Sequence, residues 1–130
     1  MRGLVLFSLL LVLLSSCDRS KSNSTLVSSK EMKELMILDS VQLIDVRTLE
    51  EFREGHLAGA QNLIYDNEFA YKIKQLDKSK PVAVYCRTGR RSEECSQILR
   101  DAGFKKIYQL KGGLSEWEYE DLLVIDSLAH

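Results

Sequence analysis

Short apolar runs alternate along the chain with longer segments whose apolar residues recur at helical spacing, from about Leu26 to Leu122. The apolar runs predict strands at residues 41–46, 62–64, 82–85 and 106–110. The helical spacing predicts helices at residues 28–37, 48–55, 67–76, 92–102 and 115–122. Such alternation is typical of an α/β fold, with a mainly parallel sheet that helices cover on both faces.

Two segments carry the residues of a capping box, in which an N-cap side chain and a later glutamate bond each other's backbone N–H groups. These segments are Ser28-Ser29-Lys30-Glu31 and Thr48-Leu49-Glu50-Glu51. Gly103 follows the helix predicted at residues 92–102 and is its expected C-cap. The capping residues therefore mark the same helix ends as the apolar pattern.

The first residues have the pattern of an export signal. Residues 4–14 form an apolar run broken only by Ser8, with Arg2 before it. This run is too short to span a bilayer as a helix, which takes about 20 residues. It ends in the sequence LSSC, which resembles a bacterial lipobox, so we expect a lipoprotein signal peptide at residues 1–16 and lipid on Cys17. An ordinary signal peptide and an uncleaved anchor are the alternatives.

The segment after Cys17 contains no apolar side chain as far as Thr25, which is typical of a solvated, flexible tether. We therefore expect the lipidated cysteine and tether at residues 17–25, one folded domain at 26–124 and a tail at 125–130. A lipid anchor on Cys17 would attach the domain to a membrane without spanning it. The expected location is the bacterial cell envelope, on the periplasmic side.

Composition limits the classes of function. The chain has 130 residues, 45% hydrophobic and 28% charged, which suits a single globular domain. Its net charge of −1 gives no general case for nucleic-acid binding. Neither histidine nor cysteine recurs at metal-ligand spacing, so we expect no metal and no organic cofactor.

One cysteine stands where chemistry is expected. Cys86 follows the strand predicted at residues 82–85, and Arg87, Arg90 and Arg91 come within the next five residues. A loop that wraps from a strand into a helix points its N–H groups inward and forms an anion-binding concavity. A thiol there has a lowered pKa and reacts as the thiolate. The alternative, a buried inert cysteine beside solvent-facing arginines, does not explain the three arginines.

The residues that follow Cys86 are the expected substrate-binding loop. Gly89 is the expected position of a positive φ that closes the loop. Any of the three arginines could hold the anionic end of a substrate. The expected binding residues are Arg87, Thr88, Gly89, Arg90, Arg91 and Ser92.

Three motifs in order resemble the rhodanese-like sulfurtransferase family. They are CRTGRRS at residues 86–92, LIDVR with EF and GHLAGAQN between residues 43 and 62, and LKGGL with a tryptophan between residues 110 and 117. The resemblance covers about residues 26–122. It implies a five-stranded parallel sheet with flanking helices, and a Cys86 that carries a persulfide sulfur. The expected reaction moves this sulfur from a thiosulfate-like donor to a small thiol or cyanide. We also expect a monomer that uses no cofactor.

The resemblance also implies supporting residues around the loop. Asp45 and Arg47, at the end of the strand predicted at residues 41–46, and His56, in a glycine-flanked turn, are expected to support the site rather than to react. Trp117 is expected in the core. Gly112 and Gly113 are expected to pass closely beside the loop.

The loop has two alternative interpretations. A cysteine phosphatase or arsenate reductase needs an arginine six residues after its cysteine, and Ser92 stands there instead. A non-catalytic rhodanese-like binding module often lacks the cysteine, which this chain keeps. Cys95 is expected to be a small packed residue, since a resolving thiol needs its Cα within about 7 Å of that of Cys86.

Overall fold

The computed structural model describes residues 24–126. The predicted signal peptide, Cys17, most of the tether and the last four residues of the tail lie outside the described residues. The described chain contains these elements in order: β1 Ser24–Val27, α1 Ser29–Met36, β2 Gln42–Asp45, α2 Leu49–Glu54, β3 His56–Leu57, β4 Gln61–Asn62, α3 Phe69–Lys72, the 3-10 turn η1 Ile73–Gln75, β5 Val82–Tyr85, α4 Arg90–Asp101, β6 Ile107–Leu110, the 3-10 turns η2 Gly113–Glu116 and η3 Glu120–Leu122, and β7 Leu123–Val124.

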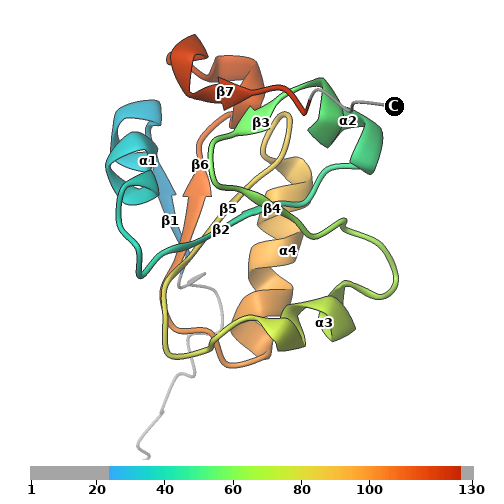
Figure 1. The fold of residues 1–130 in the computed structure, drawn as a ribbon. Helices are drawn as coiled ribbons and strands as arrows, with labels where there is room; N and C mark the ends of the chain where they lie inside the picture. Colours follow the sequence, from blue (N-terminus) through green and yellow to red (C-terminus); the bar gives the residue numbers. More distant parts are fainter. Residues whose placement is uncertain (1–23, 127–130) are drawn as a thin grey trace, which may run out of the picture.

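Five strands form one sheet in the order β1-β6-β5-β2-β4, and every pair in it is parallel (Figure 1). β3 and β7 form a separate antiparallel pair. The predicted α/β fold with a mainly parallel five-stranded sheet is therefore confirmed. All four residues of the central strand β5 are buried, as expected for a strand with helices on both faces.

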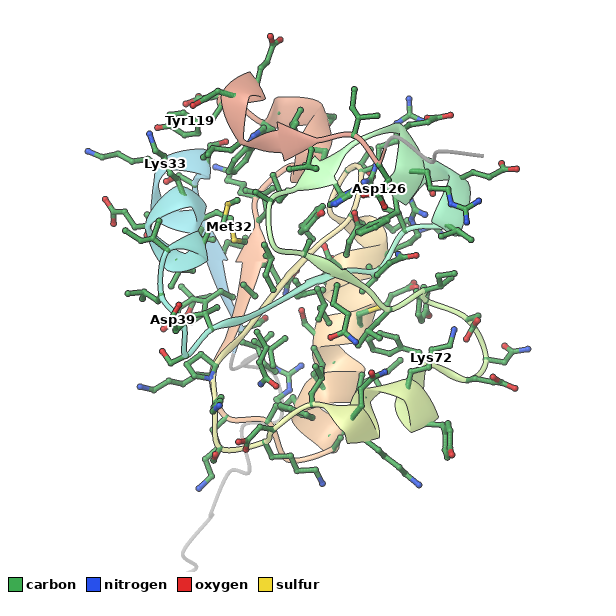
Figure 2. All side chains as sticks on the ribbon, viewed as in Figure 1. Met32, Lys33, Asp39, Lys72, Tyr119 and Asp126 are labelled. Atoms are coloured by element: carbon green, nitrogen blue, oxygen red, sulfur yellow. The ribbon has the colours of Figure 1, made fainter. Side chains whose placement is uncertain are left out.

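Two apolar cores lie on the two faces of the sheet. On one face, Met32 of α1 packs with strand residues such as Leu43 and Tyr85, and the chain after β6 completes the cover. Figure 2 shows Met32 on the side of α1 that faces the sheet. On the other face, α3, η1 and α4 pack against Ile44 and Val84. Within residues 24–126, no helix has the length and apolar character needed to cross a bilayer.

Both predicted capping boxes are confirmed. The Glu31 N–H donates to the Ser28 hydroxyl over 3.1 Å, and the Ser28 N–H donates to the Glu31 carboxylate over 3.2 Å. Thr48 and Glu51 make the same two bonds, each 3.2 Å long, at the start of α2. These bonds satisfy N–H groups that a helix start leaves without partners.

The domain begins earlier than predicted. Ser24 and Thr25, expected in the tether, belong to β1, which pairs with β6 at the edge of the sheet. Only Val27 of this strand is buried, so its sequence lacks the apolar run that marks an inner strand. The sheet therefore includes Ser24 and Thr25, two residues before the predicted start of the domain at Leu26.

The closing helix predicted at residues 115–122 is wrong. Two short 3-10 turns occupy this segment, and the strand β7 follows it. Trp117 separates the turns with an extended backbone, and its indole N–H donates to the Tyr119 carbonyl over 2.7 Å. The Trp117 side chain is half-buried against the core on the α1 face.

Smaller differences concern boundaries. α4 begins at Arg90, two residues before the predicted start. The helix predicted at 67–76 is shorter, with α3 followed by η1. The glycine-flanked turn around His56 contains β3, whose partner β7 is far away in sequence, so local pattern gave no sign of it.

Candidate active site

Cys86 lies directly after β5, at the carboxyl end of the strand between β6 and β2. Ligands of open parallel sheets bind at this edge. Residues 86–89 turn from β5 into α4, and the turn ends at Gly89, whose φ is 101°. This confirms the positive φ expected at Gly89, a conformation that a side chain would strain.

The Cys86 sulfur accepts backbone hydrogen bonds from the loop. The Gly89 N–H lies 3.1 Å from Sγ and the Ser92 N–H lies 3.4 Å away. The Ser92 hydroxyl oxygen is 3.5 Å from Sγ and also donates to the Gly89 carbonyl over 3.0 Å. The N-cap and first turn of α4 therefore direct two backbone donors at the sulfur.

These contacts set the charge state of Cys86. Burial alone would raise the pKa of the thiol, because a buried anion loses its hydration. The hydrogen bond between the thiol and the Ser92 hydroxyl, together with bonds from the N–H groups of Ser92, Gly89 and Thr88, outweighs burial and lowers the pKa below its ordinary value of 9.0. The loop thus favours the thiolate, which is the nucleophilic form.

The Cys86 side chain has no exposed surface, although Arg87 and Thr88 beside it are exposed. A reactant must therefore displace the atoms that cover Sγ before it can touch the sulfur. Exclusion of water in this way strengthens the hydrogen bonds that hold an anion on the sulfur.

The segment that follows β6 supports the Cys86 loop through two backbone hydrogen bonds. The Leu114 N–H donates to the Cys86 carbonyl over 3.0 Å, and the Ser115 N–H donates to the Arg87 carbonyl over 2.9 Å. Gly113 fits against them because it has no side chain: a Cβ there would lie 2.5 Å from the Cys86 and Arg87 carbonyl oxygens. The expected close passage of Gly113 is confirmed.

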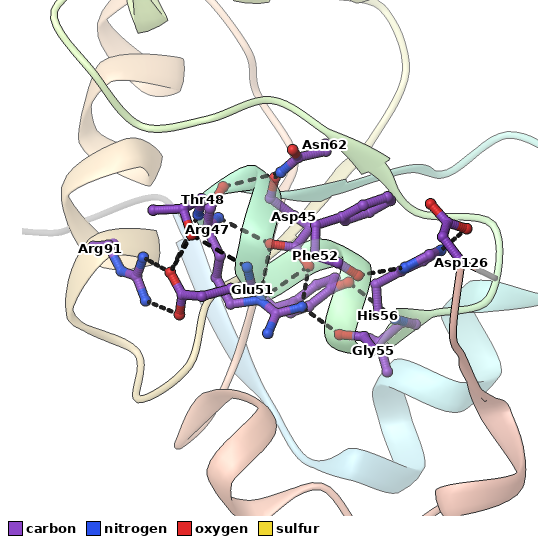
Figure 3. A network of polar contacts seen from close by, with 12 residues as sticks. Asp45, Arg47, Thr48, Glu51, Phe52, Gly55, His56, Asn62, Arg91 and Asp126 are labelled. Atoms are coloured by element: carbon purple, nitrogen blue, oxygen red, sulfur yellow. Dashed lines mark hydrogen bonds and ion pairs between the residues drawn. The ribbon is translucent and has the colours of Figure 1, made fainter. Parts of the chain in front are cut away.

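Arg91 is held by α2. Its Nη1 and Nη2 donate to the two oxygens of Glu51 over 2.6 and 2.9 Å (Figure 3). Glu51 is also the glutamate of the α2 capping box. The Arg91 guanidinium therefore forms a bidentate ion pair that joins α2 to α4. It does not point to the open side of the loop, where a substrate-binding residue was expected.

We expect the Arg91–Glu51 pair to stabilise the fold in a pH-dependent way. The Arg91 hydrogen bond lowers the pKa of Glu51 from 4.5 to about 2. A depressed pKa in the folded state gives stability that is present above about pH 4.5 and lost as the pH falls toward 2. In urea unfolding, the advantage of wild type over Glu51→Gln should shrink across this range. A constant difference from pH 7 to 2.5 would contradict the assignment.

The exposed residues of the loop face two separate hollows. Arg87 lines one of about 370 Å³ with Arg47, Glu51 and Ser115 among its neighbours. Thr88, Gly89 and Arg90 line another of about 480 Å³, together with Lys111 and Gly112. The loop thus offers Arg87 on one side and Arg90 on the other for contact with an anion.

Asp45 and Arg47 form a buried pair behind the loop. The Asp45 carboxylate accepts bonds from the Arg47 backbone N–H, Nε and Nη2, at 2.7 to 3.1 Å (Figure 3). Arg47 Nη2 also donates to the Gly55 carbonyl over 2.6 Å. The Asn62 amide donates to the carbonyls of Asp45 and Arg47 over 3.0 Å each. These bonds tie the end of β2 to β4 and to the end of α2.

His56 is enclosed by α2 and the C-terminal segment. Its ring stacks on Phe52 at 3.7 Å between centroids, and Nδ1 lies 2.9 Å from the Phe52 carbonyl oxygen. Nε2 lies 3.8 Å from the Asp126 carboxylate. Both ring nitrogens therefore face partners other than the Cys86 thiol.

Cys95 lies in the core beneath the loop, with no exposed surface. Burial raises the pKa of its thiol well above the ordinary value, and the nearby Cys86 charge adds to this effect. Cys95 is therefore a neutral, packed thiol. In the part of the chain that the structure describes, no group of three or more His, Cys, Asp or Glu residues could hold a metal ion.

Two supporting roles were missed from the sequence. Glu51 was noted as a capping residue, but nothing local showed that it also holds Arg91. The backbone donors of Leu114 and Ser115 carry no side-chain signature, because any residue there except proline could supply the same N–H groups.

Comparison with known proteins agrees with this arrangement. The rhodanese-like domain model matches residues 28–120. The chain is 36% identical to thiosulfate sulfurtransferase GlpE of Shewanella oneidensis over 91 residues, covering 70% of this chain and 89% of that protein. It is 29% identical to the uncharacterized protein YibN of Escherichia coli over 119 residues, covering 90% and 83%.

A solved structure shares the fold. The crystal structure of a rhodanese-related protein from Thermoplasma volcanium superposes with a TM-score of 0.68 at 27% identity, covering 78% of this chain and 99% of that one. The family model spans most of the described domain and includes the Cys86 loop. This chain belongs to the rhodanese-like domain family.

Proposed function

We propose that this protein is a sulfurtransferase, which moves a sulfane sulfur from a thiosulfate-like donor to a small thiol or cyanide through a persulfide on Cys86. The observation that carries the proposal is the set of Ser92 and Gly89 donors around Sγ, which lower the pKa of the Cys86 thiol. The relatives named thiosulfate sulfurtransferase GlpE support it.

In the first step, the Cys86 thiolate attacks the outer sulfur of the donor. A new S–S bond forms to Cys86, the S–S bond of thiosulfate breaks, and sulfite leaves with the bonding electron pair. The Cys86 thiol becomes a persulfide. The donor's charged end needs a cation near the loop, and Arg87 and Arg90 are the exposed arginines there.

In the second step, a thiolate or cyanide attacks the outer sulfur of the persulfide. The bond between the two sulfurs breaks, and its electron pair returns to Cys86. The N–H groups of Gly89 and Ser92 then bond the thiolate that reappears, so the same donors stabilise the leaving group. The cycle needs no cofactor and follows a ping-pong order.

The loop geometry disfavours the phosphatase alternative. A phosphatase loop places an arginine six residues after its cysteine, and here Ser92 occupies that position with its N–H on Sγ. The neighbouring Arg91 is bound to Glu51. Such a loop holds a single sulfur better than a phosphoryl group. A non-catalytic module is disfavoured because Cys86 is present with donors that lower its pKa.

The proposal is tested by mixing the full-length protein with thiosulfate and cyanide and measuring sulfite and thiocyanate. We expect both products in equal amounts and in catalytic turnover, with little hydrolysis of an aryl phosphate. Efficient aryl phosphate hydrolysis that depends on Cys86 would instead assign the protein to the phosphatases. No turnover with any sulfane donor would favour the binding module.

We expect an exposed loop arginine to bind the donor. Arg87→Ala or Arg90→Ala should raise the KM for thiosulfate, and the arginine that contacts the donor should cost roughly ten- to a hundredfold in kcat/KM, the value of a charge-assisted bond. Added salt should also raise KM. Arg91→Ala serves as the comparison, because its loss should lower stability through Glu51. Wild-type KM in both Arg87→Ala and Arg90→Ala would refute donor binding by the loop.

We further propose that Cys17 carries lipid and holds the domain at the bacterial envelope, outside the cytoplasm. The LSSC sequence after the apolar run and the polar residues that follow support this. In a bacterial host fed labelled palmitate, label and membrane association should both depend on Cys17, so Cys17→Ser should lose both. A soluble, unlabelled wild-type protein would replace the lipid anchor with an ordinary signal peptide.

A further inference from the structure

A basic hollow lies at the end of the domain opposite Cys86. The loops before β5 and β6 form a hollow of about 510 Å³. Its lining residues are Lys78, Ser79, Lys80, Pro81, Gly103, Lys105 and Lys106. Four of these are lysines and none is acidic, so positive charge is concentrated here on a chain whose net charge is −1. The proposed reaction uses none of them.

The acidic residues beside this hollow are engaged in local bonds. Asp77 accepts from the Ser79 N–H over 2.9 Å and from the Ser79 hydroxyl over 2.6 Å. Asp101 accepts from the Gln97 side-chain amide over 3.1 Å. Among residues 24–126, none forms an ion pair with any of the four lysines. Asp77 interacts electrostatically with Lys80, but the four lysines outnumber these two acidic residues, so this end keeps a positive charge that attracts an external anion.

The chain enters the fold at this same end. β1 runs parallel to β6, and Ser24 lies opposite Ile107. Ile107 directly follows Lys105 and Lys106. The start of β1 and the basic hollow therefore both lie at the amino ends of the strands. Cys86 lies at the opposite end of the sheet, after the carboxyl end of β5 (Figure 1).

The length of the preceding chain limits where lipid on Cys17 can be. From Cys17 to Ser24 the chain can span at most about 25 Å, whatever its path. A domain of this size has a radius of gyration of about 13 Å and is roughly 34 Å across. A membrane that holds Cys17 therefore lies within about 25 Å of Ser24. Because Ser24 also lines the hollow beside Thr88 and Arg90, the length of the chain alone does not decide which end meets the membrane, and the charges of the two ends decide it.

We propose that this basic end docks on anionic phospholipid headgroups and keeps the Cys86 loop turned toward the aqueous space. The proposal rests on the lipid anchor proposed above and is independent of the sulfur chemistry. Each lysine near an anionic leaflet strengthens attraction roughly fivefold. At physiological salt, charges are screened over about 8 Å, so this attraction acts only when the lysines lie close to the headgroups.

The test uses two reporters at opposite ends of the full-length, lipidated protein in vesicles. Trp117, the one tryptophan of the chain, follows η2 beyond the carboxyl end of β6. A fluorophore on Ser79→Cys marks the basic hollow, and Cys86→Ser and Cys95→Ala in the same protein leave position 79 as the thiol of the described domain that reacts. Brominated lipids quench only groups near the bilayer. In vesicles that contain phosphatidylglycerol, we expect strong quenching at position 79 and little at Trp117.

Matched charge variants show whether the lysines cause this orientation. Lys78, Lys80, Lys105 and Lys106 are changed to Gln in one protein, and the same charge is removed by Gln at Lys30, Lys33, Arg53 and Lys111 in the other. None of these control residues lines the basic hollow. Quenching at position 79 should fall roughly tenfold in the protein that lacks the four hollow lysines, and it should persist in the control. For wild type, quenching should fall by a similar factor in neutral vesicles or at high salt.

Three results would overturn the proposal. Equal quenching of the two reporters would mean that the domain has no preferred orientation. Quenching at position 79 that survives loss of the four lysines would mean that charge does not hold it. Mass spectrometry that finds no lipid on Cys17 would remove the anchor on which the orientation depends. Sulfur-transfer activity in detergent, measured in parallel on unlabelled lipidated protein that keeps Cys86, reports the proposed function separately.

Discussion

Cys86→Ser should lower sulfur transfer by at least about a thousandfold while the fold remains intact. Serine has nearly the size of cysteine, so the buried position beside Gly89 and Ser92 stays filled. Its hydroxyl does not form a persulfide, and removal of a nucleophile commonly costs this much or more. Thiocyanate formation and urea unfolding of the same samples check both halves of the prediction.

Cys95→Ala is the control for this variant. Cys95 is a buried, neutral thiol, so its truncation should cost about 1 kcal/mol of stability and leave most of the activity. Near wild-type turnover of Cys86→Ser would refute the persulfide mechanism. Loss of turnover in both variants would point to a dithiol cycle instead.

Gly113→Ala should have the second-largest effect, because it displaces the active loop. The new Cβ would lie 2.5 Å from the carbonyl oxygens of Cys86 and Arg87, both of which are backbone atoms. The loop must then shift, and a misplacement of about 1 Å can cost roughly a hundredfold in rate. The φ of 60° at this position adds about 1–3 kcal/mol of backbone strain.

Gly59→Ala separates strain from displacement. Its φ of 81° is equally unfavourable for alanine, but a Cβ there meets no atom within 4 Å. This variant should lose stability and keep its kcat. If Gly113→Ala also keeps its kcat, the residues after β6 do not position the loop, and the bonds from Leu114 and Ser115 to it are incidental.

The segment around the nucleophile could be predicted because local signals agree there. The apolar run VAVY is continuous and becomes β5 with the predicted bounds. Gly89 was the expected position of the positive φ, and it has one. Cys86 therefore had to stand at the end of an inner strand, beside a helix start.

Other parts of the fold depend on contacts between distant segments. β1 is an edge strand whose exposed residues resemble the polar tether before it, so only its pairing with β6 defines it. β3 exists because β7 pairs with it after a separation of more than sixty residues. A single sequence read by period and turn residues carries no trace of such pairs.

The direction in which each arginine side chain points could not be predicted from the sequence either. Three arginines in the loop implied a positive site, but only the packed structure shows that Arg91 turns to Glu51 on α2. Arg87 and Arg90 remain exposed on two sides of the loop. The three arginines therefore indicated a positive site correctly. Only the fold shows which arginine stabilises the structure and which ones are exposed to a substrate.

The most direct measurement is mass spectrometry of the protein after brief exposure to thiosulfate. We expect the peptide that contains Cys86 to gain the mass of one sulfur atom, and to lose it when cyanide is added, with thiocyanate released in equal amount. The Cys95 thiol should carry no such sulfur. Absence of the added sulfur on Cys86, in a sample that still turns over thiosulfate, would contradict the persulfide at the centre of this account.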